Sequence, residues 1–204
     1  MRGILITFEG GDGSGKSTQI RLLAERLTAV GLPVTTTREP GGTAAGEAIR
    51  DLLQTAKAGR NLTPEAELLL FAASRAQLVR EVMEPALASG AVVLADRFAD
   101  STTVYQGTAR KLEAENVAFV NRLALGTLRP DLTLLLDLEP EEACRRRTAR
   151  SGPDRMESLP LSFHEAVRDG YLRLAAQEPE RFRILDATLS VEALHEAVWN
   201  LLQE

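Results

Sequence analysis

Short, largely apolar runs recur along the chain and are separated by longer segments in which apolar residues return every three or four positions. Runs of the first kind predict buried strands, and segments of the second kind predict amphipathic helices. The predicted strands cover residues 3–8, 34–37, 91–95, 132–138 and 183–185. Because helices rather than hairpin turns separate the strands, the pattern predicts a five-stranded parallel sheet covered on both faces, the three-layer α/β/α class.

Several of the predicted helices carry signals for where they begin or end. Thr63 opens one of them with a good start signal, and Pro85 is expected to lie beyond its end. Ser162 and Glu165 form a capping-box pattern that predicts the start of another. The predicted helices cover residues 17–30, 63 to about 83, 162 to about 177, and 191–201.

The first predicted strand runs directly into a glycine-rich loop that precedes the first helix. The loop has the pattern G-x-x-x-x-G-K-S, which between a strand and a helix indicates a nucleotide-binding P-loop. Its glycines let backbone N–H groups converge on phosphate oxygens, and the helix N-terminus adds positive potential. Lys16 can reach the β- and γ-phosphates of ATP, and the Ser17 hydroxyl can coordinate Mg²⁺. The predicted ATP-binding residues here are Gly10, Gly11, Asp12, Gly13, Ser14, Gly15, Lys16, Ser17 and Thr18.

The rest of the chain narrows the class of P-loop protein. The N-K-x-D signature expected of a GTPase is absent, and so is the L-S-G-G-Q signature expected of a transport ATPase. The strand at 91–95 ends in Asp96-Arg97 rather than in the Asp-Glu pair typical of ATPases that activate water. An arginine at this position suits an anionic acceptor, so the pattern favours phosphoryl transfer to a second phosphorylated molecule.

Composition and charge disfavour some further functions. The chain has 204 residues, which predicts a single domain spanning residues 1–204. Its 24 basic and 29 acidic residues give a net charge of −5, which disfavours a general binder of nucleic acid or of an anionic membrane. Cys144 is the only cysteine, so we expect no internal disulfide and a reduced, partly buried side chain. Because no apolar run reaches about 18 residues and no room is left for a signal peptide, a cytoplasmic location is expected.

Four segments, taken together with the glycine-rich loop, carry a resemblance to a known family. They are T-R-E-P-G-G-T at 37–43, L-F-A-A-S-R at 70–75, D-R-F at 96–98 and S-T-T-V-Y-Q-G at 101–107. In order and spacing they resemble the bacterial thymidylate kinase family, over essentially the whole chain. The resemblance implies a P-loop kinase fold with a short lid segment, a homodimer, and transfer of the γ-phosphoryl group of Mg·ATP to dTMP in dTTP biosynthesis.

The resemblance also implies where the base of dTMP binds. Phe71 and Arg75 are four residues apart in a predicted helix, so they share one face. In the family the phenylalanine stacks on thymine and the arginine reaches its O4 atom, and both roles are carried over. Thr102 and Gln106 match the polar positions that read the pyrimidine edge, with local loop capping as the alternative. Tyr105 matches the aromatic residue that crowds the 2′ position of the sugar.

Arginines are expected to hold the acceptor phosphate. Arg38 and Arg97 match the family's phosphate-binding pair, with Arg50 nearby. Guanidinium groups suit this task because they donate two parallel hydrogen bonds. Asp12 corresponds to the acid near the 3′-hydroxyl and the metal ion, and we expect Asp12, Arg97 and Lys16 to act in catalysis. Catalysis would consist of positioning and charge neutralisation, because the attacking phosphate oxygen is already largely anionic.

A run of arginines between residues 141 and 156 is expected to form the lid. The run comprises Arg145, Arg146, Arg147, Arg150 and Arg155. A solvated helix face is the alternative explanation for such a charge run. The loop carries Gly13 where some thymidylate kinases carry an arginine, so the chain resembles the bacterial type, in which lid arginines supply that charge. Arg146 and Arg150 are expected to act in catalysis, and both, with Arg155, in ATP binding.

Two other functions stay open from the sequence. A deoxynucleoside kinase, or another nucleotide kinase of the P-loop class, would share the loop, but an acceptor without phosphate would leave Arg38 and Arg97 with no anion to bind. A regulator that senses ATP without transferring phosphate would need no second phosphate site. One departure from the family is that Lys111 follows Arg110 where many relatives have Arg-Gly, which affects the local turn rather than the chemistry.

Overall fold

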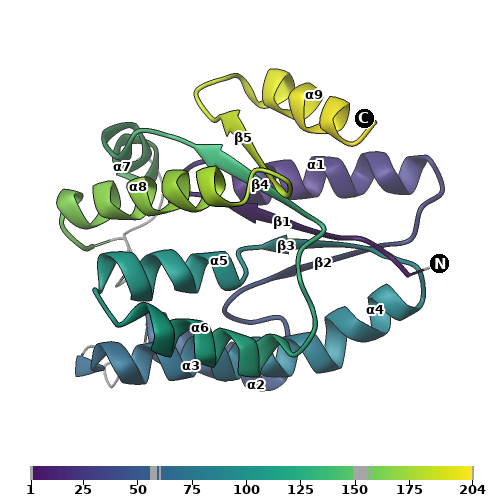
Figure 1. The fold of residues 1–204 in the computed structure, drawn as a ribbon. Helices are drawn as coiled ribbons and strands as arrows, with labels where there is room; N and C mark the ends of the chain where they lie inside the picture. Colours follow the sequence, from purple (N-terminus) through teal and green to yellow (C-terminus); the bar gives the residue numbers. More distant parts are fainter. Residues whose placement is uncertain (1, 56–58, 60, 149–155, 157, 204) are drawn as a thin grey trace.

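A computed structural model describes residues 2–55, 59, 61–148, 156 and 158–203. In these residues, parallel strands form one five-stranded sheet in the order β2-β3-β1-β4-β5 (Figure 1). The strands are β1 (Leu5–Glu9), β2 (Val34–Arg38), β3 (Val92–Asp96), β4 (Leu132–Asp137) and β5 (Phe182–Asp186). The central strand β1 is buried along its whole length, which explains its nearly continuous apolar sequence.

Helices cover both faces of this sheet (Figure 1), so the three-layer prediction is confirmed. On one face, Leu23 and Val198 of two helices are fully buried against the strands. On the other face, Leu78 and Met83 pack beside Val93 of β3. The helices are α1 (Lys16–Ala29), α2 (Ala44–Gln54), α3 (Pro64–Leu78), α4 (Glu84–Ala88), α5 (Ala99–Thr102), α6 (Ala114–Leu125), α7 (Pro140–Thr148), α8 (Leu161–Gln177) and α9 (Val191–Leu201), with π-helical segments η2 (Val79–Met83) and η3 (Thr103–Ala109).

The predicted strands all appear, and their ends differ from the prediction by no more than two residues. The helices predicted at 17–30 and 191–201 are also present, as α1 and α9. These elements were readable because each one buries a face whose period matches its backbone. Short elements next to the site, such as α5 and η3, were not predicted, because their sequence is dominated by small and polar residues without a clear period.

Three local predictions are wrong. The helical path continues past Pro85, because this proline lies in the first turn of α4, where its missing N–H is not needed. Ser162 does not cap a helix, because α8 already begins at Leu161 and Ser162 lies within its first turn. Cys144 is exposed rather than partly buried, because its neighbour Ala143 faces the core in its place.

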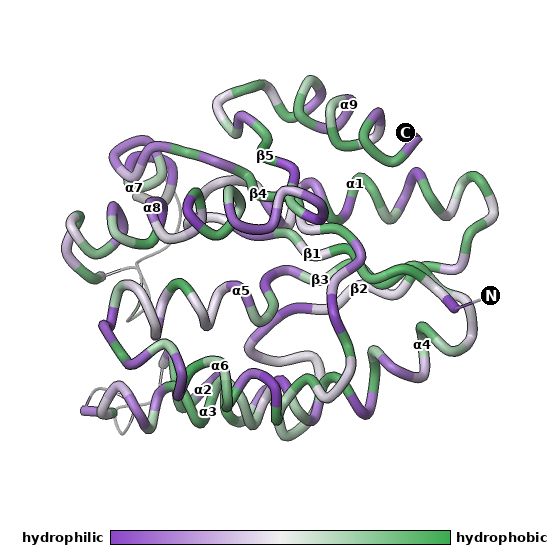
Figure 2. Tube along the Cα trace, in the orientation of Figure 1, coloured by the Kyte–Doolittle hydropathy of each residue, from purple (hydrophilic) through white to green (hydrophobic). Residues whose placement is uncertain are grey.

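The surface is mixed in character along most helices. Figure 2 shows hydrophilic and hydrophobic residues interspersed along α1 and α9. On α3 and α6, by contrast, large apolar side chains reach solvent: Leu69 and Phe119 are each 58% exposed, and Leu123 is 73% exposed. Among the described residues, no helix combines the length and the apolarity that a bilayer crossing needs.

Candidate active site at the carboxyl edge of the sheet

A cavity of about 290 Å³ lies beside the carboxyl ends of β1, β2 and β3. Parallel α/β sheets bind their ligands at this edge, because loops and helix N-termini converge there. The glycine-rich loop, α2, α3 and the α5–η3 segment complete the wall. Every residue predicted for the acceptor side lines this cavity, namely Asp12, Arg38, Arg50, Phe71, Arg75, Arg97, Thr102, Tyr105 and Gln106.

The glycine-rich loop takes a conformation that only glycine adopts without strain. Gly10, Gly13 and Gly15 have φ angles of 129°, 88° and 95°. At Gly10 a side chain would also bring its Cβ atom within 2.5 Å of the carbonyl oxygen of Leu136. The loop therefore curls tightly under the start of α1, with its backbone free to face a phosphate group.

The loop residues divide between the main cavity and its surroundings. Gly13, Gly15, Lys16, Ser17 and Thr18 line the main cavity, Gly10 and Gly11 line a small neighbouring cavity of about 20 Å³, and Ser14 is buried. The Lys16 ammonium donates to two carbonyl oxygens of the loop itself, at 2.8 and 3.2 Å. Burial, followed by the charge of Arg97, lowers the pKa of Lys16. The negative charge of a phosphate group would oppose this lowering, because a nearby anion favours the protonated ammonium.

Ser17 and Asp96 present oxygen atoms at the start of α1 and the end of β3. The Ser17 hydroxyl donates to Asp96 Oδ2 over 2.6 Å, and both residues line the cavity. Hard oxygen donors of this kind suit Mg²⁺, which binds a few protein oxygens and completes its shell with water and substrate phosphates. No group of three or more histidine, cysteine or carboxylate residues could hold a metal within the described part of the chain. The donor set therefore fits a magnesium ion shared with a nucleotide.

Arg97 enters the cavity from a strained turn directly after β3. Its φ of 70° is in the left-handed region, which bulky residues rarely adopt and which recurs at functional sites. The guanidinium donates to Asp12 over 2.5 Å, and to Ser101 and Tyr171 over 3.2 and 3.3 Å. It also lies 5.0 Å from the centre of the Tyr105 ring. The side chain is 15% exposed, so one face of this cation stays open to the cavity.

A buried carboxylate, Glu9, lies behind Arg97. Glu9 is fully buried at the end of β1 and accepts hydrogen bonds from the backbone N–H of Phe98, at 2.7 Å, and from Ser101 and Tyr171, at 2.6 and 2.7 Å. Both hydroxyls are also partners of Arg97. Burial, and next the charge of Asp100, raise the pKa of Glu9 to about 7. Glu9 therefore orients the groups that hold Arg97 and titrates near neutral pH.

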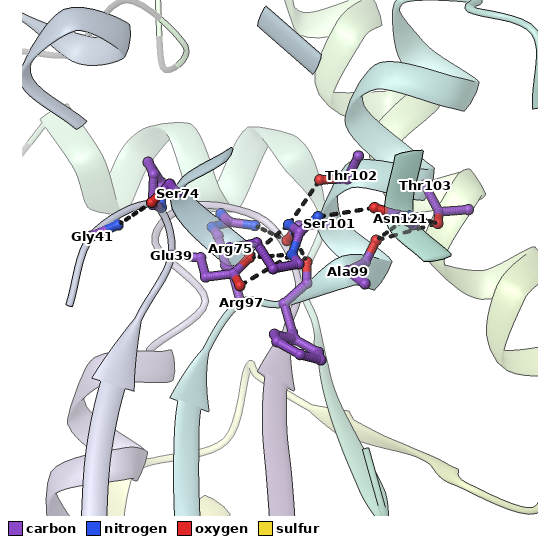
Figure 3. Close-up of polar contacts among 12 residues, drawn as sticks. Glu39, Gly41, Ser74, Arg75, Arg97, Ala99, Ser101, Thr102, Thr103 and Asn121 are labelled. Carbon is purple, nitrogen blue, oxygen red and sulfur yellow. Dashed lines mark hydrogen bonds and ion pairs between the residues drawn. The ribbon is translucent and has the colours of Figure 1, made fainter. Parts of the chain in front are cut away.

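Arg75 is enclosed on α3 by partners from three other segments (Figure 3). Its side chain is 1% exposed and forms an ion pair with Glu39, which is 3% exposed, over 2.6 Å. Further hydrogen bonds reach Asn121, at 2.9 Å, and Thr102, also at 2.9 Å. Burial raises the pKa of Glu39, while the charge of Arg75 opposes that change. This network leaves the guanidinium in a single orientation at the cavity wall.

Arg38, Arg50 and Phe71 line the cavity with side chains that are less buried than that of Arg75. Arg38 is half exposed at the end of β2 and pairs with Glu47 over 2.8 Å. Arg50 donates to the carbonyl oxygen of Pro40 over 2.9 Å. Phe71 lies one helical turn before Arg75 on α3, so its ring and that guanidinium share one wall, as their spacing predicted.

Thr102, Tyr105 and Gln106 are buried along the α5–η3 segment. Thr102 accepts a hydrogen bond from Arg75, and Gln106 donates one to Glu67 of α3 over 3.0 Å. Both side chains thus bond to residues of α3 instead of capping their own loop. The segment is held in place by α3 and α8 and serves as a fixed wall of the cavity.

The structure describes only some of the predicted lid arginines. Arg150 and Arg155 lie outside them, and so does the side chain of Arg147. Arg146 on α7 donates to the carbonyl oxygen of Ala187 over 2.9 Å and to Glu142 over 2.8 Å, away from the residues that line the cavity. Arg145 pairs with the same glutamate and is largely exposed.

Several residues around the cavity were not among the predicted site residues. Asp96 carried a usable signal, since it precedes Arg97 at the end of a buried strand. Glu39 lies within the T-R-E-P-G-G segment but was not given a role. Glu9, Asn121 and Tyr171 carried no local signal that separates them from other polar residues, and only the packing of distant segments brings them to the two arginines.

Known proteins resemble this chain over its full length. A family model described as thymidylate kinase matches residues 8–198. A thymidylate kinase of Bradyrhizobium sp. (strain ORS 278) is 47% identical, with 100% of this chain and 91% of that protein covered. One from Caldanaerobacter subterraneus subsp. tengcongensis is also 47% identical, with 100% and 97% covered. A crystal structure of thymidylate kinase from Ehrlichia chaffeensis matches with a TM-score of 0.81 at 33% identity, and the match covers 100% of both chains.

Proposed function

Because the chain belongs to the thymidylate kinase family and phosphorylates dTMP to dTDP with ATP, we propose that the cavity at the carboxyl edge of the sheet is where this transfer takes place. The observation that carries the proposal is the meeting of the glycine-rich loop with four arginines, Arg38, Arg50, Arg75 and Arg97, around one space of about 290 Å³. A kinase for two phosphorylated substrates needs both kinds of group at one place.

On the donor side, the glycine-rich loop from Gly10 to Thr18 binds the phosphates of ATP through its N–H groups. Lys16 neutralises charge on the β- and γ-phosphates. Ser17 and Asp96 would hold Mg²⁺, which when bound supplies positive charge to the phosphate oxygens. The loop curvature and the 2.6 Å contact between Ser17 and Asp96 support this assignment.

On the acceptor side, Arg97, Arg38 and Arg50 hold the phosphate of dTMP, and Asp12 lies beside it. A phosphate oxygen of dTMP forms a bond to the γ-phosphorus as the bond from that phosphorus to the β–γ bridging oxygen breaks, giving dTDP and ADP. No general base is required, because the attacking oxygen is already anionic. Arg97 and Lys16 therefore act by position and charge.

At the other end of the cavity, Phe71 stacks on thymine, and Arg75 donates to its O4 atom. Thr102 and Gln106 face the remaining edge of the base, and Tyr105 crowds the 2′ position of the sugar, which favours deoxyribose. Arg75, Thr102 and Gln106 are buried, and hydrogen bonds from Arg75 to Thr102 and from Gln106 to Glu67 hold them, which supports the assignment because base recognition needs fixed donors and acceptors.

The lid at about 141–156 supplies Arg146, Arg150 and Arg155 to ATP, with Arg146 and Arg150 acting in catalysis. The substitution Arg150→Ala is expected to lower kcat far more than it raises KM for dTMP, since charge on the moving phosphoryl group is greatest in the transition state. Arg145→Ala, at an exposed position of α7, is the matched control. An unchanged kcat in the Arg150→Ala variant would contradict the assignment.

The whole chain, 1–204, is proposed to act as one domain and to form a homodimer in the cytoplasm, without nucleic-acid or membrane partners. The exposed Leu69, Phe119 and Leu123 on the adjacent helices α3 and α6 support a self-association surface. Sedimentation of the purified chain should give the dimer mass, and Leu123→Glu should give the monomer mass. A wild-type monomer at micromolar concentration would refute this part of the proposal.

The direct test of the proposed site is ADP release from Mg·ATP with dTMP, dUMP, dCMP, dGMP, AMP and thymidine. Fast release with dTMP, weaker release with dUMP and none with thymidine are expected, because one methyl group discriminates only about 10–200-fold, whereas the arginines need an anion. Fast release with thymidine would show that Arg38 and Arg97 do not bind an acceptor phosphate. ATP binding without release in any reaction would indicate a nucleotide sensor instead.

A further inference from the structure

Gln106 lines the cavity, and its side-chain amide is hydrogen-bonded to the buried carboxylate of Glu67. Its Nε2 atom donates to Glu67 Oε1 over 3.0 Å, and both side chains are 1% exposed. Glu67 lies in the first turn of α3 and does not line the cavity, whereas Gln106 lies in η3 and does. Glu67 is therefore a neighbour of the cavity wall rather than a part of it.

The chemistry of Glu67 determines which end of the Gln106 amide faces it. A carboxylate only accepts hydrogen bonds, so the amide must turn its NH₂ group towards Glu67. Arg110 donates to both oxygens of Glu67, each over 3.3 Å, so both oxygens act as acceptors there as well. The Oε1 atom of Gln106 is consequently the polar atom left for the cavity, and among the described residues it accepts no hydrogen bond.

The opposite constraint applies to the neighbouring wall residue Arg75. A guanidinium only donates hydrogen bonds, and Glu39 and Asn121 hold it in place. The cavity wall thus presents a donor, Arg75, and an acceptor, Gln106 Oε1. Thymine and uracil match this pair, since O4 accepts and N3–H donates. Cytosine has the reverse pattern at both positions, with a donor amino group at C4 and an acceptor at N3.

We propose that Glu67, without touching the substrate, determines the preference for thymine over cytosine by holding the Gln106 amide in one orientation. The inference rests on the proposed role of the cavity in binding dTMP. It assigns to Glu67 a positioning role and to Arg110 the task of holding that carboxylate in place. A purely structural role would instead make Glu67 a link between α3 and η3 that affects all substrates equally.

The test compares kcat and KM for dTMP and dCMP in Glu67→Gln with those of the wild type. The new amide both donates and accepts, so Gln106 can turn and present either end to the cavity. We expect KM for dTMP to rise about 10-fold with little change in kcat, and the ratio of kcat/KM for dTMP to that for dCMP to fall about 10-fold or more. Glu65→Gln, at an exposed position on the same helix turn, should leave both values unchanged.

The exchanged pair Glu67→Gln with Gln106→Glu provides a rescue. The amide now on α3 can donate to the carboxylate now on η3, whose outer oxygen still accepts from N3–H, so the ratio should return to near the wild-type value. This double variant also carries the test if Glu67→Gln alone yields no folded enzyme, and a ratio that stays low in it overturns the proposal. Equal losses for dTMP and dCMP in Glu67→Gln also overturn it. A wild-type enzyme with no dTMP-dependent ADP release would refute the proposed function itself, which is a separate result.

Discussion

Two arginines face the same cavity and are held in opposite ways. Arg75 is 1% exposed, lies on a regular helix and is paired with a carboxylate that is itself buried. Arg97 is 15% exposed, has a left-handed backbone conformation and is paired with the partly exposed Asp12 of the glycine-rich loop. In the proposed binding mode, Arg75 would keep its partners when dTMP binds, whereas Arg97 would exchange Asp12 for the phosphate group.

The difference matches what each arginine is proposed to recognise. Reading the edge of a base depends on direction, so the donor must be fixed by neutral and charged partners before the ligand arrives. Holding a phosphate depends on charge, so the cation needs an open face and a counter-ion that can be displaced. The desolvation of a buried ion pair is acceptable at the base end, because Glu39 stays there to compensate Arg75.

Removing Arg97, the arginine proposed to bind the acceptor phosphate, should have the largest effect. Arg97→Ala is expected to lower kcat/KM for dTMP by about 10³-fold or more, because charge stabilisation by one arginine in phosphoryl transfer reaches that size. The melting temperature should change little, since the pair that is lost, with Asp12, is partly exposed to solvent. Steady-state ADP release and a thermal melt measure both. Arg21→Ala, on the exposed face of α1, is the control, and a loss below 10-fold in the Arg97 variant would contradict this role.

Breaking the ion pair between Arg75 and Glu39 should mainly affect stability. Glu39→Gln leaves the Arg75 charge buried without a counter-ion, which typically costs about 3–5 kcal/mol of unfolding free energy. At about 2–4 °C per kcal/mol for a chain of this size, the melting temperature should fall by roughly 10 °C. The matched substitution in the ion pair of Arg97 is Asp12→Asn, and it should lower the melting temperature by only a few degrees. Similar melting temperatures for the two variants would remove the distinction between the two arginines.

Glu9 should make kcat/KM for dTMP depend on pH, because it orients the groups that hold Arg97. This is the smallest of the three effects. As the pH falls through about 7, Glu9 gains a proton and can no longer accept from Phe98, Ser101 and Tyr171 together. Between pH 8 and 6, kcat/KM for dTMP should therefore fall about 10-fold in the wild type. Glu9→Gln should show a flatter profile over that range. The dTMP phosphate titrates identically with both enzymes, so parallel profiles would exclude Glu9 as the cause.

The same pKa shift has the opposite sign for stability. The pKa of folded Glu9, about 7, is above the ordinary value of 4.5, so the folded state binds the proton more tightly than the unfolded state. The stabilisation is fully present below about pH 4.5 and is lost as the pH rises through 7. The unfolding free energy of the wild type should accordingly decline across this window relative to Glu9→Gln. Denaturant unfolding at pH 5, 6 and 7.5 measures the difference.

Much of the fold and of the site was predictable because the relevant information is local. Each strand of the sheet is a short apolar run, and the glycine-rich loop lies in one continuous segment between β1 and α1. Phe71 and Arg75 share a wall because residues four apart on a helix lie on one face. For the acceptor side, the residues named from the family resemblance all line one cavity. Their individual roles stay predictions until the substitutions are measured.

Tertiary structure decided which hydrogen-bond partners surround the residues of the site. The sequence by itself determined the five strands, the long helices α1 and α9, and the glycine-rich loop between β1 and α1. Only the folded chain decided that Glu39 and Asn121 enclose Arg75, that Glu9 and Tyr171 stand behind Arg97, and that Arg146 bonds away from the cavity. These contacts join segments far apart along the chain, and no periodicity or motif encodes them. Hydrogen bonds and desolvation act through space, so the charge and direction of a buried group are settled only where distant segments pack together.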